Sequence, residues 1–325
     1  MALRHAADAA MDCLKVSSTD HVLVITNPEM RAVADALAGA AEERTASTRL
    51  QEYPTQSRDG QEPPAEIAEA MLEASAIFAP TTYSISHTQA RAGATQRGAR
   101  IATMGGLRID SFTRAIAVDY DRLASVTASI ARVLTTASTA RVTAAAGTDL
   151  RLDLAGRTAI RDDGRLGEPG EWGNLPAGEA YIAPVETAAN GVIVFDGALA
   201  GHGRLRDPLS VVVEDGYLTS AAGAAADWLL TTLDAGGPNG RRIAELGVGT
   251  NPAARLCGEI LEDEKVMGTI HLAFGTSSSI GGVNDATVHI DGVLTSPTLI
   301  VDERHTVLSE GVVTRGRGDV IVPSS

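Results

Sequence analysis

Two histidines and an aspartate near the C-terminus could bind a metal ion. His271 lies in the apolar run 269–275, and His289 and Asp291 are two residues apart in the run 287–291. The second run alternates polar and apolar residues, so we expect a strand in which residues two apart point to the same face. A neighbouring strand that carries His271 would complete a set of two histidines and one carboxylate. Such a set with open positions occurs in non-haem iron(II) sites and forms part of several zinc sites.

The same three residues have a simpler interpretation. His289 and Asp291 could form a hydrogen-bonded pair, and His271 could be a core residue of its strand. The spacing alone leaves both interpretations open, because a histidine two residues before an aspartate is a short and common pattern.

Two glutamates stand where a carboxylate needs a partner. Glu179 follows a turn with proline and glycine and begins an apolar run, and Glu245 stands among apolar residues and glycine. We expect both to be buried, where an ionised carboxylate costs several kcal/mol unless it is paired or bound to a metal. The partner is either a metal ion or an arginine such as Arg241 or Arg242.

The first half of the chain alternates helix and strand patterns, which predicts a parallel sheet with covered faces. Helices are expected at 5–16, 28–44, 65–74, 86–98 and 119–137, and strands at 20–27, 48–53, 76–82 and 100–106. Ligands tend to bind beyond the carboxyl ends of such strands. His87 follows the apolar run 76–85 at one of these ends, and Thr82 and Ser86 lie near it in sequence.

The pattern changes near residue 138 to short alternating runs bounded by glycine, aspartate and asparagine. Strands are expected at 179–185, 191–199, 209–218, 269–275, 286–294, 298–303 and 311–322, with helices at 221–235 and 254–265. This pattern predicts a mainly antiparallel sheet with added helices. The fold class expected is therefore an α/β domain with a parallel sheet over 1–137, followed by a β-rich metal-binding domain over 138–325.

The composition favours a cytoplasmic protein and argues against a nucleic-acid partner. The formal net charge is −14, from 41 acidic and 27 basic residues, so a polyanion would be repelled. Cys13 and Cys257 lie far apart and form no secreted disulfide pattern, which is typical of a reducing compartment. Residues 1–16 lack the unbroken apolar core of a signal peptide, and no stretch reaches the ~18 apolar residues of a membrane span. We therefore expect no membrane partner.

Four motifs, in this order, resemble those of the thermophilic metalloaminopeptidase family typified by aminopeptidases T and S. They are NLPAGEAYIAP, ELGVGTNPAARLCGEILEDEK, GTIHLAFG and HIDGVL, and the resemblance extends over most of the second half. In that family the first two motifs each supply a glutamate, the third a histidine, and the last a histidine and an aspartate around a two-metal centre. The resemblance thus implies five metal ligands: Glu179, Glu245, His271, His289 and Asp291.

A shorter branch that is similar in size to this chain includes the 2,5-dihydroxypyridine 5,6-dioxygenases. These use one iron(II) held by two histidines and an aspartate, which matches His271, His289 and Asp291. The stretch 84–106 also resembles that branch, which makes His87 a candidate for substrate contact. The aminopeptidases are longer than this chain and carry a tyrosine at the position of Ser278.

The first functional hypothesis is a metal-dependent hydrolase that cleaves an amide bond of a small amino-acid or peptide-like substrate. Two divalent ions, either zinc, cobalt or manganese, would lower the pKa of a bridging water and polarise the carbonyl. Glu264 is a candidate general base, although its acidic surroundings are also typical of a surface helix, and His87 would orient the substrate. Ser278, Thr82 and Ser86 are expected to line the substrate pocket.

The second hypothesis is ring cleavage by one iron(II), with Glu179 and Glu245 supporting the site instead of binding the ion. The third is a metal-binding structural or interaction protein without activity. The resemblance also implies a homodimer.

Overall fold

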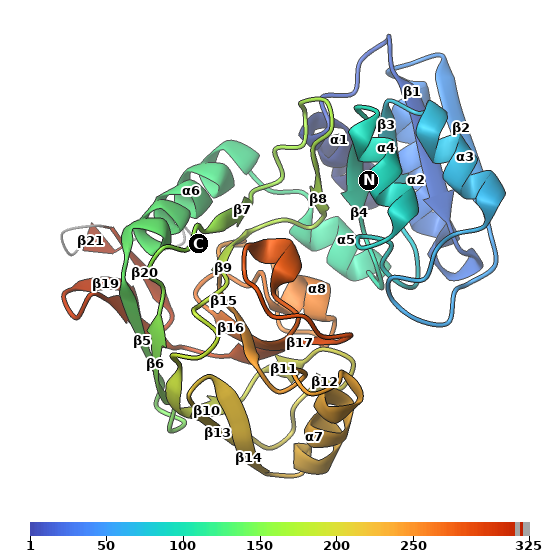
Figure 1. The fold of residues 1–325 in the computed structure, drawn as a ribbon. Helices are drawn as coiled ribbons and strands as arrows, with labels where there is room; N and C mark the ends of the chain where they lie inside the picture. Colours follow the sequence, from blue (N-terminus) through green and yellow to red (C-terminus); the bar gives the residue numbers. More distant parts are fainter. Residues whose placement is uncertain (316–318, 321–325) are drawn as a thin grey trace. The chain divides into compact units, whose positions relative to one another are not determined.

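The computed structural model describes residues 1–315 and 319–320, which form two compact units. The first unit comprises residues 1–124 and 162–177, and the second comprises residues 125–161 and 178–325 (Figure 1). Part of the strand expected at 311–322, namely 316–318 and 321–322, lies outside the described residues.

The first unit contains the expected parallel sheet. Its strand order is β2-β1-β3-β4-β8, and each neighbouring pair runs parallel. The central strands are buried on both faces because helices cover them, and α3 and α4 pack on one face through a shared apolar core. The strands are β1 His21–Thr26, β2 Ser47–Glu52, β3 Ala76–Ala79, β4 Arg100–Thr103 and β8 Trp172–Asn174. The helices are α1 Ala2–Cys13, η1 Pro28–Met30, α2 Arg31–Glu42, α3 Ala65–Glu73, α4 Gln89–Gln96 and α5 Ile109–Ala115, with α6 Tyr120–Thr136 continuing into the second unit.

The units differ from the division expected after residue 137 in two places. The boundary falls inside α6, and residues 162–177 return to the first unit. They return because β8 pairs in parallel with β4, with Trp172 opposite Ile101 and Asn174 opposite Thr103. A three-residue strand that contains glycine has too little periodicity to be recognised from the sequence. α5 also has no counterpart among the expected helices.

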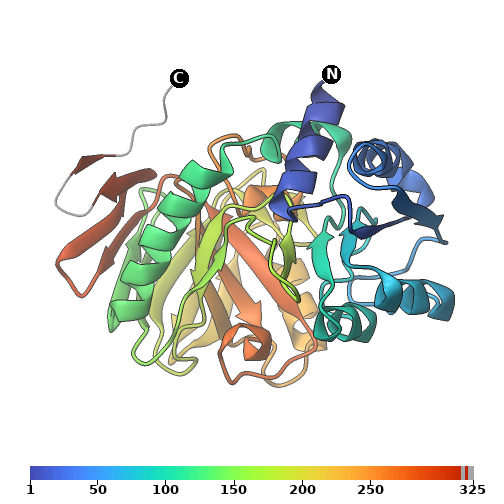
Figure 2. The same cartoon turned by 90° about the horizontal axis from the view of Figure 1, so that it is seen from above.

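The second unit is built from antiparallel sheets, as expected. Within the described residues one sheet has the order β14-β13-β10-β6-β5-β18-β19-β20-β21 and the other has the order β12-β11-β17-β16-β15-β9-β7. Apolar side chains from both sheets and from α6 and α7 form one shared core, and Figure 2 shows α6 alongside the strands. The helical elements are α7 Ala226–Ala235, α8 Ile260–Asp263 and η2 Ser278–Ile280. The strands are β5 Thr139–Thr143, β6 Asp149–Asp153, β7 Ile160–Asp162, β9 Glu179–Ile182, β10 Asn190–Phe195, β11 Ala198–Leu199, β12 Gly203–Arg204, β13 Leu209–Glu214, β14 Tyr217–Ala222, β15 Ile243–Gly249, β16 Ile270–Gly275, β17 His289–Leu294, β18 Thr298–Val301, β19 His305–Ser309, β20 Val312–Arg315 and β21 Asp319–Val320.

The helix expected over 254–265 is wrong over most of its length, because only α8 forms there. The backbone amides of Cys257 and Gly258 donate to the carboxylate of Asp263, and that of Arg255 donates to Glu262. These acidic side chains capture the preceding backbone in a loop, so it cannot form the hydrogen bonds of a helix. Glu262 and Asp263 are fully buried as a result.

Candidate metal centre

The five expected ligands lie on one face of the sheet that contains β9, β15, β16 and β17. Strand register fixes this arrangement, because side chains directly opposite each other share a face and residues two apart along a strand share it too. The pairs in register are Gly249 with Glu179, Gly247 with His271, Glu245 with Ala273, Ala273 with Asp291, and Gly275 with His289.

The intervening residues point to the opposite face and secure the strands in the core. Leu246 and Val248 of β15 and Leu272 and Phe274 of β16 all belong to the shared apolar core of the second unit. The alternation therefore does two things at once. One face buries apolar area, and the other presents histidines and carboxylates from strands that cannot slip by one residue without exposing the core residues.

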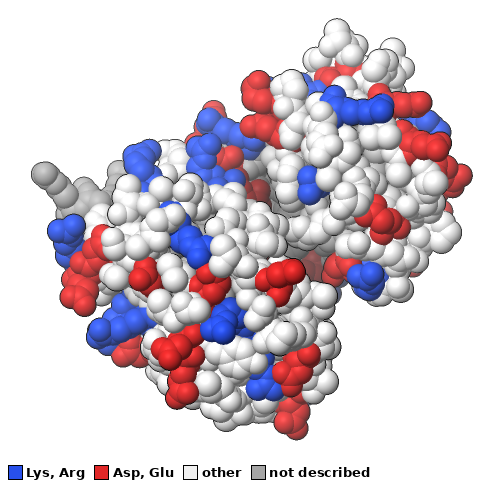
Figure 3. Space-filling model, in the orientation of Figure 1, with Lys and Arg blue, Asp and Glu red and all other residues white. Residues whose placement is uncertain are grey.

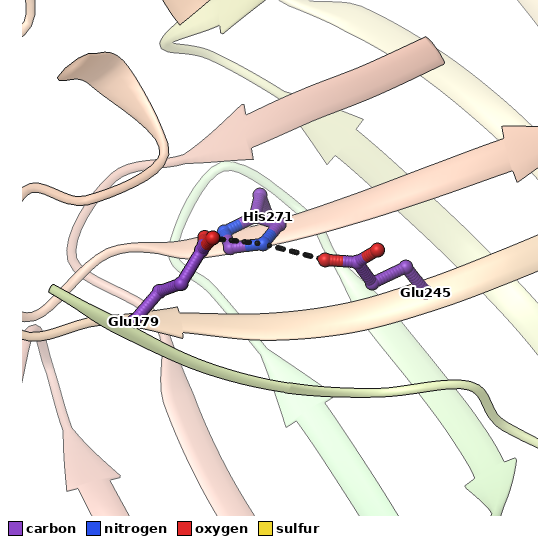
Figure 4. A group of neighbouring side chains, drawn as sticks. All are labelled: Glu179, Glu245 and His271. Carbon is purple, nitrogen blue, oxygen red and sulfur yellow. Dashed lines mark hydrogen bonds and ion pairs between the residues drawn. The ribbon is translucent and has the colours of Figure 1, made fainter. Parts of the chain in front are cut away.

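His271 lies between two carboxylates (Figure 4). Its Nε2 atom is 3.1 Å from Oε1 of Glu245 and 3.3 Å from Oε2 of Glu179, and the side chain is fully buried. The Nδ1 atom of the same ring is buried and has no hydrogen-bond partner among the described residues. The simpler interpretation of His271 as a core residue does not account for two carboxylates converging on one nitrogen.

His289 is oriented by the backbone that follows β16. Its Nδ1 atom donates to the carbonyl oxygen of Thr276 at 2.8 Å, so Nε2 is the nitrogen that faces Glu245 and Asp291, each at 3.4 Å. In a neutral ring with this hydrogen bond, Nε2 carries the lone pair. A backbone carbonyl that fixes the tautomer in this way is typical of histidines that bind metals.

The cluster has room because small residues form the sheet beneath it. Gly247 lies directly opposite His271, and a Cβ atom added at Gly247 would lie 1.9 Å from Nε2 of that ring. Ala273, which lies opposite both Glu245 and Asp291, is also small. A larger residue at either position would occupy space that the cluster uses.

Charges within the cluster shift the pKa values of its members. Burial alone would raise the pKa of Glu245, but hydrogen bonds from His271 and His289 hold it well below its ordinary value. Burial alone would lower the pKa of His271, but Glu245 and Glu179 raise it to about 9. The pKa of His289 is raised well above its ordinary value, against the effect of burial, by Asp291 and Glu245. The site therefore attracts positive charge.

A buried lysine contacts one side of the cluster. The Nζ atom of Lys265 is 2.9 Å from Oε1 of Glu179 and 2.6 Å from Oε1 of Glu264, and its side chain is fully buried. Glu264 is 12% exposed, so the alternative of a solvated helix face for this residue is wrong. Of the two arginines considered from the sequence, Arg241 pairs with Asp234, and Arg242 donates to the backbone carbonyl of Asp215.

The donor set fits a divalent cation. Two groups of three side chains offer ligand atoms within 4.8 Å of one another: Glu179, Glu245 and His271 form one, and Glu245, His289 and Asp291 form the other. They share Glu245. Carboxylate oxygens and imidazole nitrogens suit zinc, manganese and iron(II) alike, and the negative charge of the carboxylates opposes their burial until a cation neutralises it.

A loop of the second unit supports His289 from outside the cluster. Buried Glu186 accepts hydrogen bonds from Ser277 Oγ at 2.9 Å and from the amide of Val283 at 2.6 Å, and it pairs with Arg157 at 2.5 Å. These contacts fix the loop between β16 and β17, whose Thr276 carbonyl orients His289. Ser278 lies in the same loop, where its hydroxyl contacts only the hydroxyl of Thr276 among the interactions described.

The remaining predicted residues lie in the first unit, at the carboxyl ends of β3 and β4. His87 is exposed in the turn before α4, and its ring meets Trp172 edge to face at 6.3 Å. Ser86 is buried and shares hydrogen bonds with Thr103 at 2.8 Å and Asn174 at 3.3 Å. Thr82 lines a cavity of about 730 Å³ within this unit.

Sequence reasoning did not single out three residues that the structure places in or beside the cluster: Lys265, Gly247 and Glu186. Lys265 follows three acidic residues, a pattern more typical of solvated surface. The signal that could have identified it was the need of Glu179 for a buried partner. The other two act through strand register and loop contacts, which local sequence does not reveal.

Two further findings concern possible partners. Among the described residues, no helix is long and apolar enough to span a bilayer. On the face drawn in Figure 3, basic and acidic side chains are interspersed. The basic side chains on that face therefore form no continuous surface. The formal net charge of the chain is −14.

Comparisons with known proteins identify the relatives of this chain. The family model NicX, described as 2,5-dihydroxypyridine 5,6-dioxygenase, matches residues 2–315. No curated protein gives a significant match. Among solved structures, 2,5-dihydroxypyridine dioxygenase from Pseudomonas putida KT2440 is 19% identical with a TM-score of 0.80, covering 99% of this chain and 97% of that one. Wild-type AmpT from Thermus thermophilus is also 19% identical, with a TM-score of 0.68 and 99% of each chain covered.

These comparisons confirm the expected family relationship and fold class. Both structures share the fold over nearly their whole length. The family match favours the second of the two activities considered from the sequence, ring cleavage, over amide hydrolysis.

Proposed function

The chain belongs to the NicX family of 2,5-dihydroxypyridine 5,6-dioxygenases, and on that premise we propose that it is an iron(II)-dependent ring-cleaving dioxygenase. The substrate class proposed is a small hydroxylated nitrogen heterocycle. The observation that carries the proposal is the placement of His271, His289 and Asp291 on one face of two adjacent strands, within a chain that the family model matches over residues 2–315.

His271, His289 and Asp291 would hold the ion, a two-histidine, one-carboxylate set that leaves positions open. When bound, iron(II) supplies the redox chemistry that lets dioxygen react with an aromatic ring. The contributions of the chain itself are geometric and electrostatic. Thr276 keeps Nε2 of His289 turned towards the carboxylates, and Glu245 accepts a hydrogen bond from Nε2 of His271 when that nitrogen carries a proton.

Three side chains of the cluster are also largely shielded from water. His271 is fully buried, and Glu245 and Asp291 are each less than a tenth exposed. Charges in such surroundings act more strongly than in water. We further propose that His87 contacts the substrate, with Thr82 and Ser86 near it in the first unit, and that Ser278 lies at the rim of the pocket.

The test is an oxygen-uptake assay on protein loaded anaerobically with iron(II). A dioxygenase inserts both oxygen atoms into its substrate without an external reductant, so 2,5-dihydroxypyridine and dioxygen should disappear in equal amounts. His87→Ala should lower this rate while leaving the iron content unchanged. Absence of turnover with a panel of dihydroxylated pyridines, in protein that holds iron, would refute the proposal.

A metalloaminopeptidase is the second candidate, because the two donor groups share Glu245 and could bind a pair of ions bridged by one carboxylate. Protein loaded with zinc, cobalt or manganese would then hydrolyse amino-acid amides. A binding protein without activity would show neither reaction. The homodimer remains a prediction, which light scattering of the purified protein would test.

A further inference from the structure

Lys265 is a buried cation built into the wall of the metal cluster. Its side chain is fully buried, and its ammonium contacts Glu179 at 2.9 Å and Glu264 at 2.6 Å. The backbone on either side is also held: the Lys265 amide donates to the carbonyl of Glu262 at 3.0 Å, and the Lys265 carbonyl accepts from the amide of Asn251 at 2.8 Å. The ammonium is therefore fixed beside Glu179.

The lysine makes the two donor groups unequal. The group of Glu179, Glu245 and His271 includes the carboxylate that Lys265 contacts, whereas the group of Glu245, His289 and Asp291 does not include Glu179. An ammonium has three donors and no acceptor, so it cannot act as a metal ligand. It would repel a divalent ion bound at Glu179, and burial strengthens that repulsion.

The Lys265 ammonium also supplies Glu179 with the positive charge that a second metal ion would otherwise supply. Glu179 is 5% exposed, and a buried carboxylate requires an opposite charge. Its Oε1 atom obtains that charge from Lys265, while Oε2 lies 3.3 Å from His271. Glu179 is thus neutralised without any metal on its side of the cluster.

We propose that the Lys265 ammonium takes the place of a second metal ion, so that the cluster holds a single divalent ion on the side of His289 and Asp291. His271, which lies 3.1 Å from Glu245, completes the donor set. Glu179 is then an ion-pair partner and not a ligand. This inference rests on the proposed function in one respect, that the cluster binds a divalent ion.

The test counts ions in metal-free protein reloaded with zinc or manganese, by elemental analysis after gel filtration, and measures their affinity by calorimetry. These probes need no turnover. Wild-type protein should bind one ion per chain. Glu179→Gln should keep that ion with an affinity changed by less than ~10-fold, whereas Asp291→Asn, which removes a ligand, should lose more than ~100-fold.

Lys265→Met should raise the count towards two ions per chain, because Glu179 is then free to bind metal. Combining Lys265→Met with Glu179→Gln should return the count to one. If Lys265→Met fails to fold, as loss of its circular dichroism would reveal, the wild-type count and the Glu179→Gln affinity decide the matter.

Three results would overturn the inference: two ions in wild-type protein, an equal loss of affinity in Glu179→Gln and Asp291→Asn, or a count of one in folded Lys265→Met. Two ions in wild-type protein would overturn this inference but would still agree with a metal-dependent enzyme. Binding of no ion at all would refute the proposed function as well, so the two failures are distinguishable.

Discussion

Replacing Gly247 by alanine should disable the metal centre while preserving the sheet. The added Cβ atom would lie 1.9 Å from Nε2 of His271, whereas ordinary van der Waals contact begins at 3.4 Å. The ring must therefore move by about 1.5 Å, because the close-packed strand beneath cannot yield by that distance. Ligand positions in metal sites tolerate about 0.2 Å.

We expect Gly247→Ala to lower the affinity for zinc or manganese by about 100-fold, equivalent to about 2.7 kcal/mol. Calorimetric titration measures the affinity, and thermal unfolding checks the fold. Gly39→Ala is the matched control, since a Cβ atom there meets nothing within 4 Å. It lies in helix α2 and should stabilise the protein by about 0.5–1 kcal/mol without affecting metal binding.

The proposed cause can be separated from a general loss of packing by combining variants. If Gly247→Ala acts by displacing His271, adding it to His271→Ala should cost little further affinity, because the displaced ring is already absent. Undiminished metal affinity in folded Gly247→Ala, or a full additional loss in the double variant, would refute the reasoning.

Three further predictions concern other parts of the chain. His289→Ala should lower metal content far more than His202→Ala, since His202 lies in a turn against Trp228; equal losses in elemental analysis would count against the site. Glu186→Gln should weaken metal affinity by about 10-fold by loosening the loop between β16 and β17, and unchanged calorimetry would contradict this. Asp20→Asn should lower the free energy of unfolding at pH 7 by about 3 kcal/mol, because Asp20 forms a buried ion pair with Arg100. Burial alone would raise the pKa of Asp20, but hydrogen bonds from Ser17 and Ser75 and the charge of Arg100 lower it, so this contribution is present at neutral pH and lost as pH falls below ~4. Urea denaturation at pH 7 and pH 3 should therefore show a difference between wild type and variant that shrinks on acidification.

Periodicity predicted the fold class because it records burial directly. The apolar run 20–27 became β1, and the alternating run that contains His289 became β17 with its predicted face. The return of residues 162–177 to the first unit was not predictable, since it depends on the pairing of β8 with β4, a contact between residues about 70 positions apart. Local pattern carries no information on such a pairing.

The site shows the same division between local and distant causes. That His289 and Asp291 share a face follows from their spacing, whereas the placement of Glu179 and Glu245 on that same face depends on the order and register of four strands. The acidic run before Lys265 is typical of solvated surface, but this indication is wrong. Glu262 and Asp263 are buried because their carboxylates bind the backbone amides of the preceding loop, which their charge alone does not predict.

Fold does not decide between the two reactions, because a 2,5-dihydroxypyridine dioxygenase and AmpT resemble this chain at the same 19% identity over nearly its full length. The distinction has to arise from the charges around a shared set of donors. Two ions bridged by one carboxylate suit water activation, whereas one ion with open positions suits a substrate and dioxygen. By the inference above, Lys265, which contacts Glu179, favours one ion over two. A side chain that cannot bind a metal can thus set the number of ions, and through it the reaction that the cluster supports.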